Sequence, residues 1–255
     1  MGRLDGKVAL ILGASTRGGI GEAIAKAYAR AGAKLMLSAR RGEDAEQIAR
    51  EVSGKALRCD VTREEDIAAL VAATLDHYGR LDVAVDVAGG HASETFDALK
   101  PETLRRILEI NVVAPAMFIK QCARSMSPGG SIIIVSSHSS ELTTPGIGPY
   151  ACSKASIERL VQVAAFEYGA KHIRVNTLSP SMLDTPMSKP ALDRPGLRQA
   201  YEKETPLGRL ATVEEVAGTA LWLASDECFT TGDRIRVGGG IHLRRFPLPG
   251  EFGSG

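Results

Sequence analysis

"LGASTRGGIGEAIAKAYA", residues 12–29, joins a short apolar run to a helical pattern through a loop rich in glycine. The glycines stand at positions 13, 18, 19 and 21, so the common G-x-G-x-x-G spacing is absent. Glycine lets a backbone turn sharply and approach a ligand closely. The question is therefore whether this loop binds phosphate or is an ordinary turn between a strand and a helix.

The position of the loop favours phosphate binding. It follows the apolar run 7–12 and opens the helical pattern 21–31. A helix N-terminus offers free N–H groups and a partial positive charge. Gly13 stands at the end of the run, and Gly19, Ile20 and Gly21 stand where the helix is expected to begin. We predict that these four residues contact a pyrophosphate, with a plain strand-to-helix turn as the alternative.

Composition is that of an ordinary soluble globular chain. The 255 residues are 44% hydrophobic and 24% charged, with a net charge of +1. This charge gives no bulk attraction to nucleic acid or to an anionic membrane, and no apolar run approaches the roughly 18 residues that span a bilayer. The N-terminus does not resemble a signal peptide. The four cysteines are widely spaced, which favours reduced thiols in the cytoplasm and no metal site.

Apolar runs of strand length alternate with longer helical patterns along the chain. The expected strands are 7–12, 34–38, a run ending at 60, a run ending at 87, 131–137, 173–179 and 234–238, and the expected helices are 21–31, 64–78, 101–125, 149–169 and 213–224. This alternation predicts an α/β fold, with a parallel sheet of seven strands covered by helices on both faces. We expect one domain, residues 1–255, in which the aperiodic segment 244–255 is a flexible tail.

The segment "PYACSKASIERL", residues 149–160, carries Tyr150 and Lys154 four positions apart. Such residues share one face of a helix, so the phenol and the ammonium are expected to be neighbours. A phenol with a pKa near 10 is a poor base. A unit charge at about 4 Å contributes roughly 4 kcal/mol at an effective dielectric of 20, which is enough to make a phenolate accessible. The pair is predicted to be a general acid/base, with a solvated helix face as the alternative.

Ser137 lies 13 residues before Tyr150, at the end of the buried run "SIIIVSS". Ligands in parallel α/β sheets bind beyond the carboxyl ends of strands. A serine at this place can therefore donate a hydrogen bond to a substrate oxygen. Ser136, Ser139 and Ser140 are close competitors for the role.

In this order, these motifs resemble those of the short-chain dehydrogenase/reductase family. The resemblance runs from Val8 to about Leu243, and it also includes "CDVT" (59–62), "VAGG" (87–90), "NVVAP" (111–115) and "RVNTLSP" (174–180). It implies a Rossmann-type, doubly wound single domain, a nicotinamide cofactor and hydride transfer to or from a carbonyl or alcohol carbon. It also implies the small-molecule substrate and the homotetramer that we expect as partners.

The resemblance also implies roles for individual residues. Tyr150 is the acid/base, Lys154 assists it and binds the nicotinamide ribose, Ser137 polarises the substrate oxygen, and Asn111 supports a proton relay through water. Asp60 is expected near the adenine, and Thr185 near the carboxamide or pyrophosphate. The remaining expected cofactor contacts are Ser15, Arg17, Arg40, Val61, Ala88 and Gly89.

The sequence departs from the family pattern in the glycine loop and at three later places. Leu12 replaces a threonine, and two residues are inserted between Gly13 and Gly19. The family's N-N-A-G reads D-V-A-G at 86–89, its P-G reads P-S at 180–181, and its Asp before the final G-G is Gly238. None of these changes removes a catalytic group. His91 and His138 follow strand ends but receive no role.

The residues after the second expected strand favour NADP(H) over NAD(H). Proteins that bind NAD usually have a carboxylate about 20 residues after the glycine loop. Here Ala39 lies 18 positions after Gly21, and Arg40 and Arg41 follow. A guanidinium matches the charge and the oxygens of a 2′-phosphate, and Arg17 is expected to approach it from the inserted loop. Solvated arginines at a helix start are the alternative, which leaves NAD open.

The helix expected at 150–168 has apolar residues on more than one side, among them Leu160, Val163 and Phe166. A helix that is apolar on two sides has more surface to bury than one sheet face covers. We therefore predict a homo-oligomer, most simply a tetramer, with burial under the chain's own tail as the alternative. Residues 182–201 are expected to form a mobile lid with few helices.

The leading function is an NAD(P)-dependent carbonyl reductase or alcohol dehydrogenase. A non-catalytic dinucleotide sensor or scaffold on the same fold is the alternative from another class. A sensor has no need of a proton donor, so Ser137, Tyr150 and Lys154 argue against it. An epimerase or dehydratase is a second enzymatic alternative, which usually requires a larger substrate domain.

Overall fold

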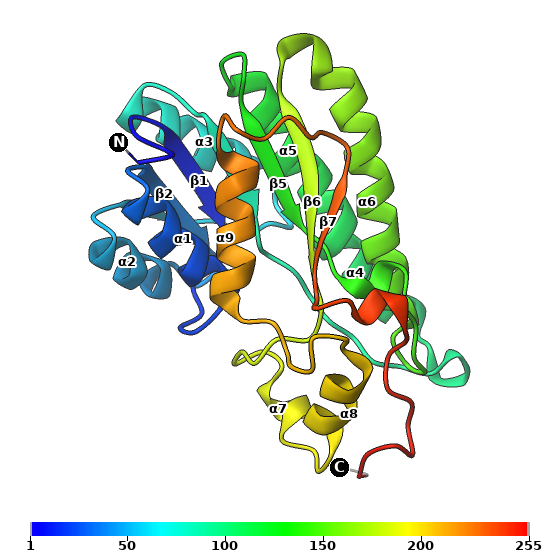
Figure 1. Cartoon of the computed structure of the whole chain (residues 1–255). Helices are drawn as coiled ribbons and strands as arrows, with labels where there is room; N and C mark the ends of the chain where they lie inside the picture. The colour runs from blue at the N-terminus through cyan, green and yellow to red at the C-terminus, as the bar shows by residue number, and fades with distance from the viewer. Residues whose placement is uncertain (1, 254–255) are drawn as a thin grey trace.

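Seven parallel strands form one sheet through the centre of the computed structural model, which describes residues 2–253 (Figure 1). They are β1 (Val8–Leu12), β2 (Lys34–Ala39), β3 (Lys55–Arg58), β4 (Val83–Asp86), β5 (Ser131–Val135), β6 (Arg174–Pro180) and β7 (Arg234–Val237). Their order is β3-β2-β1-β4-β5-β6-β7, and every neighbouring pair is parallel. The predicted fold class and the seven-stranded sheet are confirmed.

The direction of the chain across the sheet reverses between β1 and β4, which lie side by side. Leu12 at the end of β1 pairs with Ser38 of β2 on one side and with Asp86 of β4 on the other. Every residue of β1 and β5 is buried, as the continuous apolarity of these runs predicts. Ligands of such sheets bind beyond the carboxyl ends of strands at the reversal. The loops after β1 and β4 are therefore the expected place of a site.

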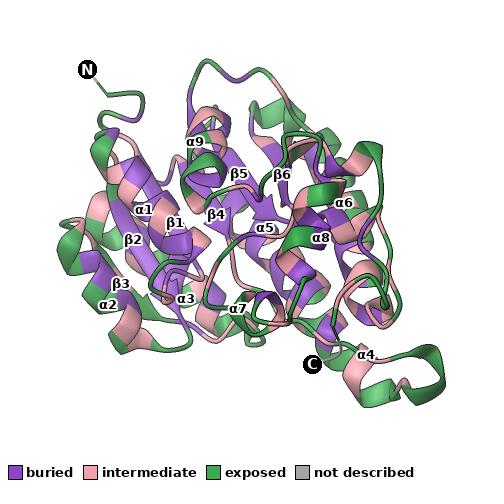
Figure 2. Cartoon of the chain, turned by 60° about the horizontal axis from the view of Figure 1, so that its bottom comes forward, coloured by how far each residue is buried: buried purple, intermediate pink, exposed green. Residues whose placement is uncertain are grey.

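Helices cover both faces of the sheet. α1 (Ile20–Arg30), α2 (Gly42–Glu51) and α9 (Val213–Ala224) pack on one face, and α3 (Glu64–Tyr78), α5 (Ala114–Ser125) and α6 (Gly148–Tyr168) on the other (Figure 1). Alternate residues of each strand point to opposite faces, so Ala9 and Ile11 join the first core and Leu10 and Leu12 the second. The buried residues lie between the layers, and the outer helix faces are exposed (Figure 2).

The stretch 101–125, predicted as one helix, contains an irregular turn. α4 (Pro101–Leu108) passes into a π-helical turn at Glu109–Val113, and α5 follows at once. A single π turn inserts an extra residue into a helix and is frequent at functional sites. The turn here carries Asn111, whose side chain is buried.

The segment predicted as a lid with few helices is more regular than expected. It contains the short helix α7 (Lys189–Leu192) and the beginning of α8 (Leu197–Glu204), which the sequence analysis did not predict. Proline at the start of α7 and glycine before α8 look like loop residues in the sequence, but they stand at the helix beginnings. The lid is therefore rich in loops, as predicted, but it also carries two short helical segments.

The C-terminal segment packs against this lid (Figure 1). Phe246 is 5% exposed and shares a small apolar cluster with Tyr201 of α8. Further along, the Arg194 guanidinium lies 4.9 Å from the centre of the Phe252 ring, and Gly253 N donates to Pro195 O at 2.8 Å. The segment expected as a flexible tail thus contacts the lid up to residue 253, and residues 254–255 lie outside the described part.

Replacing Phe246 by alanine should release this segment from the lid. The Phe246 and Tyr201 ring centres are 5.9 Å apart, and emptying a buried aromatic site costs about 3 kcal/mol or more. Limited proteolysis should cleave residues 244–253 faster in Phe246→Ala than in the wild-type protein. Phe229→Ala removes a ring that is fully exposed and should leave the cleavage rate unchanged. Equal protection in Phe246→Ala would contradict the packing role.

Candidate active site

The glycine loop after β1 lies against the loop after β4. Gly13 has a φ of +96°, and a Cβ built on it would lie 2.6 Å from Ala88 N. A Cβ on Gly21 would lie 2.5 Å from Gly13 O. Both distances are far below ordinary contact, so only glycine allows this approach. The predicted cofactor residues Gly13, Gly21 and Ala88 are thus brought together.

The N-terminus of α1 points out of this loop with free backbone donors. Gly19 is the N-cap and has no side chain to cap the helix. The first helical hydrogen bond runs from Ala23 N to Gly19 O, 3.1 Å, so the N–H groups of Ile20 and Gly21 precede it. Free N–H groups at a helix N-terminus, beside a backbone that only glycine can form, suit a pyrophosphate. The residues present therefore fit a dinucleotide cofactor.

The inserted part of the loop is held by carboxylates. Arg17 donates to Glu51 of α2 at 2.5 and 2.7 Å and to Glu22 of α1 at 2.9 Å. Glu22 is buried and also accepts from Gly18 N at 2.7 Å and from Lys26 at 2.9 Å. Bonds from these groups hold the pKa of Glu22 below its usual value although burial acts to raise it. Arg17, expected to contact a 2′-phosphate, is instead paired within the protein.

Two arginines at the end of β2 differ in their surroundings. Arg40 is exposed, and no hydrogen bond or ion pair engages its side chain among residues 2–253. Arg41 donates to Asp44 at 2.5 Å and reaches Ser15 Oγ at 3.5 Å. Ser15, an expected cofactor residue, is therefore next to Arg41.

Asp60 lies beyond the end of β3, where the adenine was expected. Its Oδ1 accepts from the hydroxyl of Thr62 at 2.7 Å and from Thr62 N at 3.1 Å. These two bonds, with a smaller contribution from the charge of Arg40, lower the pKa of Asp60. The carboxylate is thus ionised beside Val61, which is partly exposed.

Asn111 of the π turn holds the loop after β4. Its Nδ2 donates to Gly90 O at 2.9 Å, and its Oδ1 accepts from Gly90 N at 2.8 Å. The same Nδ2 donates to Ser153 Oγ of α6 at 3.0 Å. The amide thereby fixes the segment that begins with Ala88 and Gly89 and links it to the helix of Tyr150.

Lys154 is the buried cation of the site. It is 5% exposed, and its Nζ donates to Val135 O at the end of β5 at 2.9 Å. The same nitrogen lies 5.7 Å from the centre of the Tyr150 ring. The ring of His91, a residue left without a role, packs 4.9 Å from the Tyr150 ring between centres. The predicted Tyr150 and Lys154 are therefore neighbours at the end of β5.

Ser137 begins the short 3₁₀ turn His138–Ser140 at the end of β5 and contacts its own turn. Its Oγ accepts from Ser139 N and donates to Ser139 Oγ, both at 3.2 Å. Of the competing serines, Ser136 donates to Glu158 of α6 at 2.6 Å, and Ser140 donates to Ser137 O at 2.9 Å.

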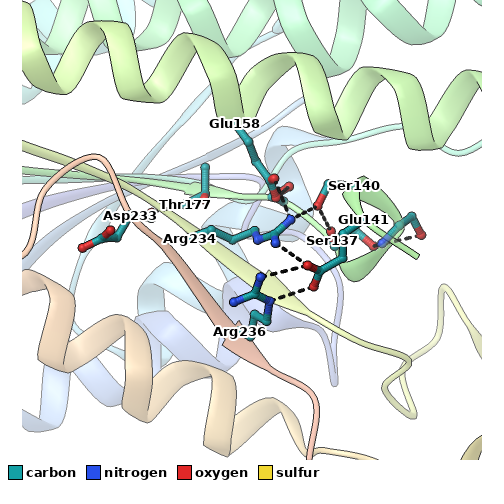
Figure 3. A network of polar contacts seen from close by, with 10 residues as sticks. Ser137, Ser140, Glu141, Glu158, Thr177, Asp233, Arg234 and Arg236 are labelled. Atoms are coloured by element: carbon teal, nitrogen blue, oxygen red, sulfur yellow. Dashed lines mark hydrogen bonds and ion pairs between the residues drawn. The ribbon is translucent and has the colours of Figure 1, made fainter. Parts of the chain in front are cut away.

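A charged network supports the Ser137 turn from β7 (Figure 3). Arg234 donates to Ser140 Oγ at 3.0 Å and to Glu158 at 3.1 Å, and it also pairs with Glu141. Arg236 donates to both carboxylate oxygens of Glu141, at 2.7 and 2.8 Å. These bonds hold the pKa of Glu141 below its usual value. The network thus joins the turn of Ser137 to α6 and to β7.

The departure at Gly238 has a structural reason. His138 is fully buried, and a Cβ on Gly238 would lie 2.6 Å from its Nε2. The aspartate that the family pattern places here would collide with this imidazole. The packing of the His138 ring, a residue that was left without a role, therefore explains why glycine replaces the aspartate at position 238.

Thr185 lies at the beginning of the lid. Its carbonyl accepts from Lys189 N at 2.8 Å, which starts α7. The neighbouring Pro186 approaches the inserted loop, because a Cβ on Gly18 would lie 3.7 Å from its Cδ. The lid therefore reaches the rim of the glycine loop.

The sequence analysis missed several residues of the site. Glu22, Ser153 and Glu158 bind groups that it did predict. Ser153 had a local signal, because it lies between Tyr150 and Lys154 on one helix. Glu22 has partners in the inserted part of the loop, and Glu158 has partners that are distant in the sequence, so no spacing rule identifies these two residues.

Two other features are absent from residues 2–253. No helix there combines the length and apolarity that crossing a bilayer requires. No three histidine, cysteine or acidic side chains in that range are arranged to hold a metal ion.

Comparison with known proteins places the chain in a family. A family model described as "Enoyl-(Acyl carrier protein) reductase" matches residues 13–242. The mitochondrial borneol dehydrogenase of Lavandula x intermedia is 35% identical, over 94% of this chain and 92% of its own length.

Solved structures agree with this match. A short-chain type dehydrogenase/reductase from Mycobacterium ulcerans superposes with a TM-score of 0.92 at 31% identity, covering 96% of this chain and 92% of that one. A gluconate 5-dehydrogenase from Burkholderia cenocepacia, in complex with NADP and tartrate, gives 0.90 at 30% identity, covering 95% and 97%. The relatives named here are dehydrogenases or reductases, and none supports a non-catalytic sensor. This protein is therefore an oxidoreductase that belongs to the short-chain dehydrogenase/reductase family.

Proposed function

We propose that this protein transfers a hydride between NADP(H) and the carbon of a carbonyl or secondary alcohol group, with Tyr150 as the acid/base. The observation that carries the proposal is the buried Lys154 ammonium, which lies beside the Tyr150 ring and is held by Val135 O. A positive charge next to a phenol favours loss of the phenolic proton. Tyr150 is thereby suited to the role of general acid/base.

Each group of the site has one task in this proposal. Tyr150 takes the proton of the substrate hydroxyl during oxidation and returns it during reduction. Ser137 donates a hydrogen bond to the same oxygen, and Asn111 keeps the Gly90 segment in place. The nicotinamide, when bound, accepts or supplies the hydride.

The proposed cofactor site extends across the carboxyl ends of β1 to β4. The pyrophosphate is assigned to the N-terminus of α1, and the adenosine to the end of β2 and to Asp60. The residues proposed to contact the cofactor are Gly13, Ser15, Gly19, Ile20, Gly21, Arg40, Asp60, Val61, Ala88, Gly89, Tyr150, Lys154 and Thr185.

The names of two relatives, a borneol dehydrogenase and a gluconate 5-dehydrogenase, support a small-molecule alcohol or ketone as the substrate.

The four cysteines are free thiols, which supports a reducing compartment, and we propose the cytoplasm. We also propose that residues 1–255 act as a single domain, because all seven strands belong to one sheet.

Tyr150→Phe should lower turnover by about 100-fold or more, because it keeps the ring and removes the proton. Cofactor binding, followed by fluorescence, should persist. Tyr168→Phe, at the other end of the same helix, is the matched control and should keep wild-type turnover. Turnover would be followed with a panel of ketones, sugars and steroids. Near-normal turnover of Tyr150→Phe would remove the acid/base assignment.

The preference for NADP(H) is proposed to depend on Arg40. Arg40 is exposed, and no other side chain in the described part of the chain forms a hydrogen bond or ion pair with it. Ala39 stands where NAD-binding proteins usually have a carboxylate. One relative, the gluconate 5-dehydrogenase, was solved in complex with NADP. Arg17 supports the preference less than its sequence position suggested, because Glu22 and Glu51 engage it.

The double change Ala39→Asp/Arg40→Leu should shift the ratio of kcat/KM for NADP(H) and NAD(H) toward NAD(H) by about 10-fold or more, because it removes a charge-assisted bond and adds a repulsive charge. Arg41→Leu is the control, since Arg41 is paired with Asp44, and should shift the ratio less. A wild-type protein that prefers NAD(H), or an unchanged ratio in the double variant, would show the Arg40 assignment to be wrong.

A tetramer is proposed from the outer face of α6. Val161 and Ala165 pack into the core, while Leu160, Val163 and Phe166 are exposed, the last at 90%. The C-terminal segment packs on the lid, so it does not cover these three residues. A stripe of exposed apolar side chains on a long helix favours contact with a second subunit.

Phe166→Glu should weaken this assembly, because it places a charge in the apolar stripe. Light scattering at micromolar concentration should show a tetramer for the wild-type protein and smaller species for Phe166→Glu. Phe166→Leu keeps an apolar side chain and should keep the tetramer. A monomeric wild-type protein would refute the proposal.

A further inference from the structure

Ser153 carries a buried hydroxyl group to which neither the sequence motifs nor the proposed reaction assign a task. It lies on α6, three positions after Tyr150 and directly before Lys154. Its exposed fraction is 0%. A buried hydroxyl group is costly unless hydrogen-bond partners satisfy it. The partners of Ser153 therefore show which parts of the site this side chain joins.

The Ser153 hydroxyl group joins the helix of Tyr150 to the π turn. Its Oγ donates a proton to Tyr150 O at 2.7 Å and accepts one from Asn111 Nδ2 at 3.0 Å. The first bond holds the carbonyl group of the proposed acid/base. The second crosses to a residue that lies 42 positions before Ser153 in the chain. The backbone of Tyr150 is thereby connected to a distant element through one side chain.

The two amide protons of Asn111 are both used within the protein. One is donated to Gly90 O at 2.9 Å and the other to Ser153 Oγ at 3.0 Å, while Asn111 Oδ1 accepts from Gly90 N at 2.8 Å. An amide nitrogen carries two protons, so its donors are fully engaged. A continuous chain of hydrogen bonds therefore runs from Gly90 through Asn111 and Ser153 to Tyr150.

The turn of α6 that carries Tyr150 is anchored at two places. Residues three and four positions further along a helix flank the first residue on the same face. Ser153 anchors one side of this face to the loop after β4, through Asn111. Lys154 anchors the other side to Val135 O at the end of β5, at 2.9 Å. Tyr150 is thus fixed relative to both strand ends.

We propose that Ser153 is a positioning residue: by binding Asn111 and Tyr150 O together, it sets the distance between the acid/base and the segment 88–90, on which the cofactor is proposed to lie. This inference rests on the proposed role of Tyr150. Proton and hydride transfer take place between groups held by these two elements, so a shift of about 1 Å between them slows the reaction strongly. The proton of Ser153 stays in its bond to Tyr150 O and is not transferred.

Ser156 provides a matched control on the same helix. Its Oγ donates to Cys152 O at 2.9 Å, which is a bond to its own helix like the one from Ser153 to Tyr150 O. Ser153→Ala and Ser156→Ala therefore each remove one hydroxyl group and one bond to a helical carbonyl group. Ser153→Ala additionally removes the link to Asn111. A difference between the two variants reports on that link.

The first test needs neither cofactor nor substrate. Hydrogen exchange of the Gly90 amide, which Asn111 Oδ1 holds, should be about 5-fold faster or more in Ser153→Ala than in the wild-type protein, because the Asn111 amide loses one of its anchors. Ser156→Ala should keep the wild-type exchange rate. An unchanged Gly90 rate in folded Ser153→Ala would overturn the proposal.

The second test measures the chemical step in a single turnover of the NADPH-loaded protein, with a carbonyl compound that the substrate panel identifies. The rate constant, read from the nicotinamide absorbance, should fall by about 10-fold or more in Ser153→Ala. Ser156→Ala should keep the wild-type value. A merely structural role would lower the amplitude, which counts folded molecules, and would leave the rate constant unchanged. That result would refute positioning, whatever the exchange rate of Gly90.

Two further variants at position 153 cover a folding failure of Ser153→Ala. Ser153→Thr keeps a hydroxyl group and should restore both the Gly90 exchange rate and the rate constant. Ser153→Cys fills the site with a weak donor and a weak acceptor, and it should repeat both changes of Ser153→Ala. Equal behaviour of Ser153→Thr and Ser153→Cys would contradict a role of the hydroxyl group.

Failure of this inference is distinguishable from failure of the proposed function. If Tyr150→Phe is inactive but Ser153→Ala changes neither measurement, the role of Ser153 alone is wrong. If Tyr150→Phe keeps its turnover, the acid/base assignment is wrong, and the Gly90 exchange in the cofactor-free protein still decides whether Ser153 holds the Asn111 amide in place.

Discussion

Close approach of the backbone between the ends of β1 and β4 is the constraint on which the rest of the site depends. Gly13 leaves no room for a Cβ beside Ala88, and Gly21 leaves none beside Gly13 O. The two contacts set the N-terminus of α1 directly against the loop after β4. The donors at the N-terminus of α1 and the loop after β4, which are proposed to hold the cofactor, therefore lie against each other, and any larger side chain at these glycines would separate them.

Buried polar groups at the site are satisfied mainly by one another. Asn111 engages both backbone groups of Gly90 and the hydroxyl of Ser153, and Lys154 engages Val135 O. Burial without such partners would cost several kcal/mol for each group. The π turn directs the Asn111 amide to these partners. The same bonds that keep the polar groups stable therefore also position the acid/base pair.

Departures from the common family pattern are compensated by neighbouring residues. The two inserted residues of the glycine loop bring in a cation, and Glu22 and Glu51 neutralise it. Gly238 makes room for the buried ring of His138. At the end of β4, Asp86 accepts a hydrogen bond from Ala88 N, and burial raises its pKa to about 7.

The sequence by itself determined the fold, because strand runs, helix periods and the glycine loop are local patterns that each segment carries alone. It also placed Tyr150 and Lys154 on one helix face, since four residues complete about one turn. It could not reveal the π turn at Glu109–Val113 or the helices of the lid, whose local signals are weak and whose packing partners are distant in the chain. Only the tertiary structure paired Arg17 with Glu51 and buried Asp86 near Lys154. Charge partners and desolvation depend on what lies across the sheet, and no spacing rule along the chain contains that information.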